Sequence, residues 1–434
     1  MVYDVVIIGG GVFGLSTAAQ FIRSGQKVVV IDKYAIPSPI SAANDYNKIV
    51  RLEYNDPVYA GMAVESMNYW QGNAGELLPR GLLHNTYSHC GRISVVPPET
   101  TARYKFELQS LELLKKQFGR CNDVSEYKGD LTCSGIFPQF SNARLPPTQL
   151  LRFNPDCGIG IAAKSLTRMK QYCEQNGVQF IEADGVTHVV GGDPVKVETA
   201  SGRIIVARRA LVACGANSSS LLPTGQLVKA TGLYVGHIQL TEQEYEKYKG
   251  IPVVFNPALG YFFPPDEDTK TLKICACASS TYDKSSDGVR PRYKVEEPSI
   301  VRSIPRQSVT QIRTLISQYL PDLLEFNGKL REIIDCKICW ISDTSNSDFV
   351  IDEVPHQPNV FVSCGDSGHG YKFLPNIGKY IKKRMDGTLA SPLASKWKWR
   401  EGAWGKTKLG WRMEHNRKHI DEIEWFESKL QSKL

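Results

Sequence analysis

Glycines near the start of the chain have the spacing of a turn that binds nucleotide phosphates. The run Gly9-Gly10-Gly11-Val12-Phe13-Gly14 follows an apolar segment. Gly9 would allow the tight turn, Gly11 the close approach of a pyrophosphate, and Gly14 the close packing of the next helix. Asp32, eighteen residues beyond Gly14, can accept hydrogen bonds from both ribose hydroxyls. The series predicts a dinucleotide site, which it fits better than a purely structural glycine turn.

Two cysteines form a second pattern that could do chemistry, Cys336-Lys337-Ile338-Cys339. This spacing occurs in zinc sites and in thioredoxin-like redox sites. A zinc site of that kind needs a second pair, which the sequence lacks. A thioredoxin-like motif opens a helix early in a compact domain, and this one does not. We therefore expect no metal site, and a packing role for both thiols stays open.

A lysine inside an apolar run is the third such feature. Lys273 lies in Thr271–Cys275, a strand-like segment that follows the aromatic run around Tyr261. Burying an ammonium group is costly unless the charge is used. Strand alternation also allows a surface lysine whose neighbours point inward. We favour a functional lysine.

The elements that must position these residues follow the order of a nucleotide-binding fold. Val2–Ile8 is typical of a buried strand, Leu15–Ser24 of a helix ending at Gly25, and Lys27–Ile31 of a second strand.

Later segments favour FAD over NAD as the dinucleotide. Arg203–Val206 and Arg209–Asn217 are typical of late strands in a flavin-binding domain. Asn359–Asp366 is an apolar strand that ends in Gly-Asp and precedes a helix-forming stretch. A single NAD-binding domain does not need this return segment.

Composition excludes several classes of protein. The 434 residues predict two or three domains, and 42% hydrophobic with 22% charged residues is ordinary for a globular protein. A formal charge of +7 is too diffuse to indicate nucleic acid, and it suits anionic substrates. The 11 scattered cysteines indicate reduced thiols and an intracellular protein. Val5–Leu15 lacks the features of a secretory signal, and we expect no membrane span.

The carboxyl-terminal tripeptide Ser432-Lys433-Leu434 has the form of a peroxisomal signal. We expect a peroxisomal protein that binds the import receptor through these residues, although a chance match is the alternative. His415–Leu430 is interpreted as an amphipathic charged helix that displays the signal. The basic, aromatic segment Lys396–Arg400 is interpreted as tryptophans packed on the body, because stacking on nucleic acid is the weaker explanation.

Three motifs carry a resemblance to a known family. They are Pro39–Arg51, Cys339–Asp352 and Gly365–Gly378. With them the chain resembles the sarcosine oxidase and fructosyl-amino acid oxidase family over residues 2 to 385, and within it the fungal saccharopine and pipecolate oxidases. The resemblance implies an α/β fold, in which an FAD-binding Rossmann-like domain of the glutathione-reductase type is interleaved with a mixed β-sheet substrate domain.

The expected division of the chain follows from that fold. Residues 1–85, 151–222 and 336–390 are assigned to the FAD-binding domain. Residues 86–150 and 223–335 are assigned to the substrate domain, and 391–434 to a C-terminal extension.

The resemblance also implies roles for individual residues. Cys339 would carry FAD covalently through an 8α-thioether, with Cys336 as the fallback. Arg51 and Lys372 would hold the substrate carboxylate, and Lys273 would assist the reaction with oxygen. The other residue expected to contact substrate is Tyr261. The residues expected to bind the cofactor are Gly9, Gly11, Val12, Phe13, Gly14, Asp32, Lys33, Ser41, Asn47, Lys48, Val186, Cys339, Gly368, Gly370 and Lys372.

Three further positions bear on the expected site. Lys48 can face substrate, flavin or water. His369 is expected to pack near the flavin edge and not to act as a base. Fructosyl-amino acid oxidases carry an acid four residues after the strand lysine, where this chain has Cys277, and this departure weakens that substrate class.

These expectations together predict a monomeric FAD oxidase of a secondary-amine amino acid. It would pass hydride from the C–H beside nitrogen to the flavin, release an imine that hydrolyses, and produce H2O2 from O2. L-Saccharopine is the first choice of substrate, L-pipecolate the second and a fructosyl amino acid the third. Rival classes are a flavin dehydrogenase that uses an electron carrier and a non-enzymatic flavin-binding protein.

Overall fold

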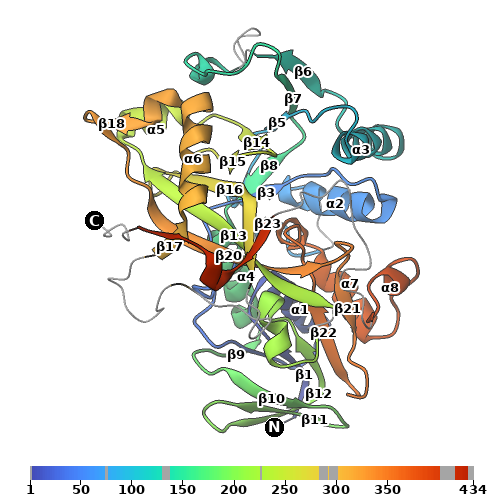
Figure 1. Cartoon of the computed structure of the whole chain (residues 1–434). Coiled ribbons are helices and arrows are strands. Elements are labelled where there is room, and N and C mark those ends of the chain that lie inside the picture. Colours follow the sequence, from blue (N-terminus) through green and yellow to red (C-terminus); the bar gives the residue numbers. More distant parts are fainter. Residues whose placement is uncertain are drawn as a thin grey trace.

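The computed structural model describes residues 2–73, 77–129, 137–224, 227–282, 292, 302–400 and 416–428 (Figure 1). Two large sheets occupy opposite halves of the molecule, and the chain crosses between them several times. The predicted architecture, an α/β domain with a largely parallel sheet interleaved with a mixed-sheet domain, is confirmed.

The eight-stranded sheet lies in the lower half of Figure 1. Five of its strands are parallel in the order β9-β2-β1-β12-β22, β10 and β11 extend it antiparallel from β12, and β21 pairs with β22. The strands are β1 (Val2–Ile8), β2 (Val28–Ile31), β9 (Gln179–Ile181), β10 (Val186–Val190), β11 (Val195–Thr199), β12 (Ile204–Val212), β21 (Val350–Glu353) and β22 (Val360–Cys364).

Alternation along β1 explains why both faces of this sheet are covered. Val5 and Ile7 pack with three helices, α1 (Val12–Arg23), α4 (Ala162–Gln175) and α7 (Ile377–Met385). Val6 and Ile8 pack on the other face with the valines of β10 and β11. An apolar strand with no polar side is the expected sequence for a sheet buried on both faces.

The nine-stranded sheet forms the upper half, in the order β20-β13-β16-β15-β14-β5-β7-β6 with β23 beside β16. Helix α6 (Arg306–Tyr319) packs its apolar side on one face of the sheet. The strands are β5 (Arg92–Val95), β6 (Ser125–Lys128), β7 (Leu150–Asn154), β13 (Val228–Gln239), β14 (Val253–Asn256), β15 (Gly260–Phe262), β16 (Thr271–Tyr282), β20 (Ile334–Thr344) and β23 (Asn416–His419).

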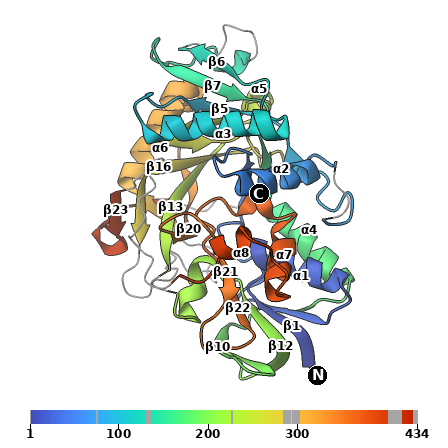
Figure 2. The same cartoon turned by 90° about the vertical axis from the view of Figure 1, so that its right-hand side faces the viewer.

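Smaller elements surround the two sheets. In Figure 2, α3 runs above α2, along the side of the upper half. The remaining elements are α2 (Pro57–Trp70), α3 (Ala102–Phe118), α5 (Glu242–Tyr248), α8 (Leu393–Lys396), β3 (Lys48–Val50), β4 (Tyr87–Ser88), β8 (Gly158–Gly160), β17 (Arg302–Pro305), β18 (Glu325–Phe326), β19 (Lys329–Leu330), β24 (Trp425–Ser428), and the 3₁₀ turns η1 (Pro138–Phe140), η2 (Gly215–Ser220), η3 (Pro321–Leu323), η4 (Tyr371–Phe373) and η5 (Ile420–Glu422).

The predicted helix over His415–Leu430 is wrong for the residues that the structure describes. This segment forms β23, η5 and β24, and β23 pairs with β16 while β24 pairs with β17. The physical reason is that both partner strands would otherwise present unpaired backbone groups at a sheet edge, and strand addition satisfies them. Ser432-Lys433-Leu434 lies outside the described residues.

Two further expectations are corrected in detail. The two late strands predicted over 203–217 are one strand, β12, paired with β1 from Val206 to Val212. The domain boundaries at 151 and 336 fall inside β7 and β20, so both strands belong to the nine-stranded sheet. Alternating apolar residues indicate a strand but not which sheet it joins.

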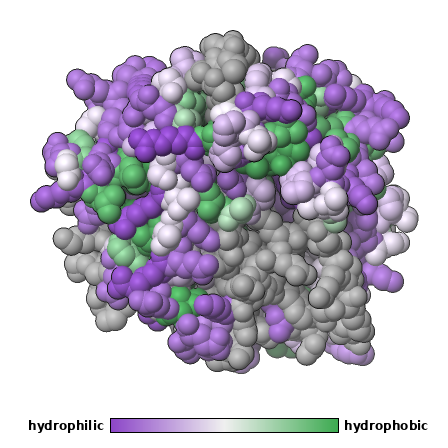
Figure 3. Space-filling view, turned by 45° about the horizontal axis from the view of Figure 1, so that its top comes forward, coloured by the Kyte–Doolittle hydropathy of each residue, from purple (hydrophilic) through white to green (hydrophobic). Residues whose placement is uncertain are grey.

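The surface is mainly polar on the face that Figure 3 shows, with apolar residues in separate patches. Trp397, inside the basic aromatic segment, is fully buried, as its packing interpretation predicts. None of the described helices has the length and apolar character needed to cross a bilayer.

Candidate active site

A cavity of about 310 Å³ lies between the two sheets. It extends from the glycine turn after β1 to the face of β13, β16 and β20. The predicted site residues that line it are Gly9, Gly11, Val12, Phe13, Asp32, Lys33, Ser41, Lys48, Val186, Tyr261, Cys339, Gly368 and Gly370. The predicted site residues outside that lining are Gly14, Asn47, Arg51, Lys273 and Lys372.

The glycine turn fits a dinucleotide. Gly9 has φ +104°, and a Cβ on Gly14 would lie 1.9 Å from the carbonyl oxygen of Gly9, so both positions require glycine. A Cβ on Gly11 would meet nothing within 4 Å, which leaves space for a phosphate. Gly11 is the N-cap of α1 and has no side chain that could accept hydrogen bonds from the first amides of the helix. These amides are therefore free to bind a phosphate in the cavity.

Asp32 closes the nucleotide end of the cavity. Its carboxylate accepts the amide of Gly10 at 2.8 Å and that of Tyr34 at 3.0 Å. Burial raises the pKa of Asp32, although these two hydrogen bonds oppose the shift. Each oxygen keeps a second lone pair, so the arrangement still suits ribose hydroxyls.

Strand alternation separates the two cysteines of the CxxC pattern. Cys339 packs with Cys275 and Val235 on the side of β20 that faces the cavity. Cys336 points to the opposite side, into the core under α6, where burial raises its thiol pKa to about 12. Of the two, Cys339 is therefore placed to meet a group in the cavity. Cys275 also lines it, and sequence reasoning missed that thiol.

Beside the cavity, one buried carboxylate holds several lysines. Asp45 forms an ion pair with Lys273 at 2.6 Å and a shorter one with Lys48, and Lys337 lies 3.7 Å away. The side chains of Asp45 and Lys273 are each 1% exposed. Lys273 also donates to the carbonyl of Asn47 at 2.7 Å. We call Asp45, Lys48, Lys273 and Lys337 the Asp45 cluster.

Charges in the Asp45 cluster depend on one another. Burial opposes ionisation of Asp45, but the lysines outweigh it and hold the Asp45 pKa well below its usual range. Burial lowers the pKa of Lys273. Burial also acts to lower the pKa of Lys48, but Asp45 outweighs it, and the pKa of Lys48 is raised. His237, next to the cluster, has its pKa lowered by burial to about 3 and stays neutral. The cluster therefore keeps an excess of positive charge beside the cavity.

A second group of cations gathers on Tyr54. Lys372 donates to the Tyr54 hydroxyl at 2.8 Å and to the His369 carbonyl at 2.9 Å, and the Arg51 guanidinium lies over the Tyr54 ring at 5.1 Å. His369 Nδ1 is 2.9 Å from the Tyr54 hydroxyl, and Nε2 is 2.8 Å from the Ser347 carbonyl. Since a carbonyl can only accept, Nε2 carries the proton and Nδ1 accepts from Tyr54. We call Arg51, Tyr54, His369 and Lys372 the Tyr54 cluster.

The Tyr54 cluster contains a lysine that no carboxylate of the described residues pairs with. Burial lowers the pKa of Lys372 well below its ordinary value, and the nearby Arg51 lowers it further. An incoming carboxylate would stabilise the charged form of Lys372. The geometry therefore suits a bound anion.

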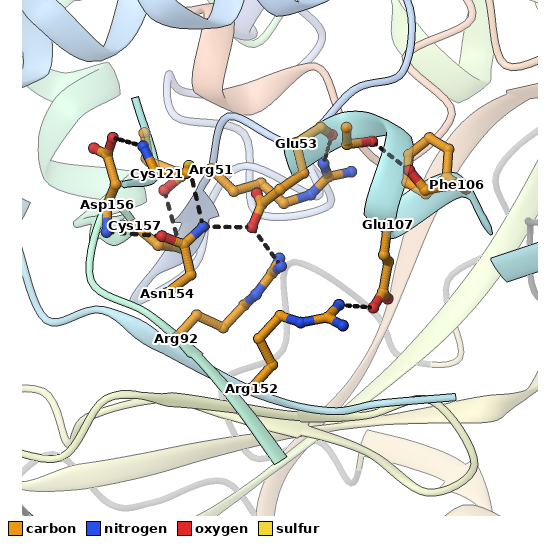
Figure 4. A network of polar contacts seen from close by, with 12 residues as sticks. Arg51, Glu53, Arg92, Phe106, Glu107, Cys121, Arg152, Asn154, Asp156 and Cys157 are labelled. Carbon is orange, nitrogen blue, oxygen red and sulfur yellow. Dashed lines mark hydrogen bonds and ion pairs between the residues drawn. The ribbon is translucent and has the colours of Figure 1, made fainter. Parts of the chain in front are cut away.

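Figure 4 shows the polar network that continues from Arg51. Arg51 donates to the carbonyl of Glu53, whose carboxylate accepts from Arg92 at 2.7 Å and from Asn154 at 2.8 Å. Although burial opposes its ionisation, Arg92 and Arg51 lower the pKa of Glu53 to about 2. Glu53 therefore stays ionised and compensates part of the local positive charge.

Sequence reasoning missed the residues that hold the predicted cations in place. Asp45 precedes Lys48 by three residues in the first motif, and Tyr54 follows Arg51 by three. A carboxylate among lysines was the available signal for Asp45. Nothing local marks Tyr54, because its partner Lys372 is 318 residues away.

Comparisons with known proteins give a consistent result. A model of FAD dependent oxidoreductases matches residues 4–384. L-Saccharopine oxidase of Schizosaccharomyces pombe is 35% identical over 94% of this chain and 95% of that protein. Monomeric sarcosine oxidase of Bacillus sp. (strain B-0618) is 22% identical over 88% of this chain and 91% of that protein.

Solved structures agree with that result. A thermally stable mutant of fructosyl peptide oxidase matches with a TM-score of 0.83 and 26% identity, over 97% of this chain and 98% of that one. The deglycating fructosamine oxidase of Aspergillus fumigatus, Amadoriase II, matches with a TM-score of 0.82 and 25% identity, over 100% and 98%.

Proposed function

Since the chain belongs to the FAD-dependent oxidoreductase family, related to the sarcosine and fructosyl-amino acid oxidases, we propose that it oxidises L-saccharopine. The predicted family resemblance is confirmed. The 35% identity to L-saccharopine oxidase over 94% of this chain favours this substrate. The observation that carries the proposal is the Tyr54 cluster, where Arg51 and Lys372 both contact one tyrosine and neither forms an ion pair with a carboxylate of the described residues.

The residues of the chain have separate tasks in this proposal. FAD supplies the acceptor for hydride and, with O2, the route to H2O2. The glycine turn and Asp32 would hold its nucleotide half. Arg51 and Lys372 bind the carboxylate next to the substrate nitrogen and so fix the orientation of the reacting C–H. Lys273 supplies a fixed positive charge for the reaction with oxygen.

A covalent flavin link through Cys339 is part of the proposal. Its place in the cavity supports Cys339, and the opposite orientation of Cys336 disfavours the fallback. Acid-precipitated protein should stay yellow, and Cys339→Ser should release the flavin into the supernatant. Cys336→Ser and Cys275→Ser are the matched controls. A colourless wild-type pellet, or release by either control, would remove Cys339 from this role.

We also propose import into peroxisomes through Ser432-Lys433-Leu434. The terminal tripeptide supports it, and β24 ties the chain to the body as far as Ser428, six residues before the end. A fluorescent protein fused to the N-terminus should reach peroxisomes with Leu434 present and stay outside them after its deletion. Identical distributions would contradict the signal.

The substrate is tested by measuring peroxide with saccharopine, pipecolate, sarcosine and fructosyl-lysine. We expect the highest kcat/KM for saccharopine, with an amino-acid semialdehyde and glutamate as products. A preference for fructosyl-lysine would contradict saccharopine as the substrate and would favour the substrate class of the solved relatives. Substrate-dependent flavin reduction with little peroxide would instead indicate a dehydrogenase that needs another acceptor. Gel filtration tests whether the protein is a monomer.

A further inference from the structure

We propose that Arg103 forms a second carboxylate-binding subsite next to Arg51, which selects substrates whose nitrogen is attached to a dicarboxylic amino acid. The inference rests on the proposed function and extends it from one carboxylate to two. In saccharopine the second carboxylate is the side-chain carboxylate of the glutamate half.

Arg103 presents an unused edge of its guanidinium group. The residue lies in the first turn of α3, and its Nε forms an ion pair with Glu107 Oε1 at 2.8 Å, one helical turn later. No hydrogen bond joins its two Nη atoms to the described residues, and the side chain is 22% exposed. Two parallel N–H groups on one edge match the geometry of a carboxylate.

Aromatic contacts place this guanidinium group close to the cavity. It lies 5.7 Å from the ring of Phe255, and the rings of Phe255 and Tyr261 are 5.9 Å apart. Tyr261 lines the cavity. Arg51 and Arg92 are near enough to lower the pKa of Arg103 beyond the effect of its burial. Arg103 therefore lies near the wall of the cavity that Tyr261 forms, and its charge is coupled to that of Arg51.

The carboxylates of this region are already occupied by other cations. Glu53 pairs with Arg92, and the second oxygen of Glu107 pairs with Arg152 at 3.0 Å, which also pairs with Glu126. Cations therefore exceed carboxylates by two among the charged groups Arg51, Arg92, Arg103, Arg152, Lys372, Glu53, Glu107 and Glu126. Two ligand carboxylates, one at Arg51 and Lys372 and one at Arg103, would balance the charge.

Two substrates of the same shape test the subsite. One is L-saccharopine, and the other is its analogue with glutamine in place of the glutamate half. Wild-type holoenzyme should prefer saccharopine in kcat/KM by about tenfold or more, because a charge-assisted hydrogen bond is lost with the amide. Arg103→Gln should bring that ratio close to one, mainly through KM for saccharopine. Lys105→Gln removes an exposed cation of the same helix and should leave the ratio at the wild-type value.

A binding measurement separates this inference from the proposed function. Glutarate should raise the Tm of wild-type holoenzyme more than butyrate does, and Arg103→Gln should abolish the difference, because only a ligand that binds the native state stabilises it. This readout works even if saccharopine is not turned over, an outcome that overturns the proposed function alone. If Arg103→Gln does not fold, Arg103→Lys keeps the positive charge but lacks the two parallel N–H groups. Its kcat/KM ratio for saccharopine over the glutamine analogue should lie between that of wild type and one. An unaltered ratio or an unaltered glutarate effect in either folded variant overturns the subsite.

Discussion

The Asp45 cluster and the Tyr54 cluster both gather cations beside one cavity, but they differ in where the balancing anion comes from. In the Asp45 cluster the chain supplies it, since one carboxylate buried to 1% exposure contacts Lys48 and Lys273 directly. In the Tyr54 cluster, Lys372 has a hydroxyl and a carbonyl as its hydrogen-bond acceptors. In the first cluster a carboxylate of the chain contacts two lysines once the protein folds, although positive charge stays in excess, whereas in the second the contacting carboxylate would come from a ligand.

This difference indicates which cations the protein needs for structure and which for recognition. A lysine held by a buried carboxylate has a fixed position and a charge that does not wait for substrate, which suits a permanent electrostatic role. Burial lowers the pKa of both Lys273 and Lys372, but Asp45 opposes the shift of Lys273 by direct contact, whereas a bound carboxylate would have to do so at Lys372. Substitutions in the Asp45 cluster should therefore change stability or the reaction with oxygen, and substitutions in the Tyr54 cluster should change substrate binding.

The largest effect is expected for Asp45→Asn, which removes the anion of the first cluster. Three lysines would then share a buried site without their carboxylate. Removing one partner of a buried ion pair typically costs about 3–5 kcal/mol. Denaturant unfolding should show a loss of this size. Lys337→Met is the matched control, because its ammonium is 3.7 Å from Asp45 and two closer lysines remain. An equal loss in both variants would mean that Asp45 is not the hub of the cluster.

Lys273→Met should act on the reaction with oxygen. The variant removes a fixed positive charge, and such charges are commonly worth about a hundredfold or more in rate. Stopped-flow measurements should show slower reoxidation by O2 with substrate reduction nearly unchanged. If reduction slows while the oxygen reaction survives, Lys273 belongs to substrate binding, and the functional division between the clusters is reversed.

The sequence predicts the nucleotide half of the site better than the rest. Gly9, Gly14 and Asp32 follow local rules of turn geometry and helix packing, and they can be located without knowledge of the fold. The Asp45 and Tyr54 clusters depend on residues that are far apart along the chain. Lys273 of the Asp45 cluster, for example, donates to the carbonyl of Asn47, which lies 226 residues away in the sequence. The family resemblance identified the lysines, but only the folded arrangement shows what each one contacts. The C-terminal strands were missed for the same reason, since their partner edges are long-range.

Lys372→Met should weaken substrate binding at the second cluster. Loss of a charge-assisted hydrogen bond costs about 1.5–3 kcal/mol, so kcat/KM should fall by roughly tenfold or more. Because the Asp45 cluster is separate, reoxidation by O2 in the same variant should keep the wild-type rate. An unchanged kcat/KM for every amino-acid substrate would exclude the carboxylate clamp.

The smallest effect is expected for Tyr54→Phe, which tests the second cluster through its pH dependence. The hydroxyl accepts a hydrogen bond from Lys372 and so favours its charged form, while the His369 carbonyl remains in the variant. Lys372 must be protonated to bind a carboxylate. Its pKa is already lowered, so KM should rise as pH increases through that pKa, and the variant should begin this rise at a lower pH. One lost hydrogen bond is worth about 0.5–1.5 kcal/mol, which predicts a change in KM of about two- to tenfold. Using one substrate for both proteins cancels the titration of the substrate amine. If the KM profiles of the variant and wild type coincide across the pH range, Tyr54 does not set the charge of Lys372, and the contrast between the two clusters must lie in Arg51 alone.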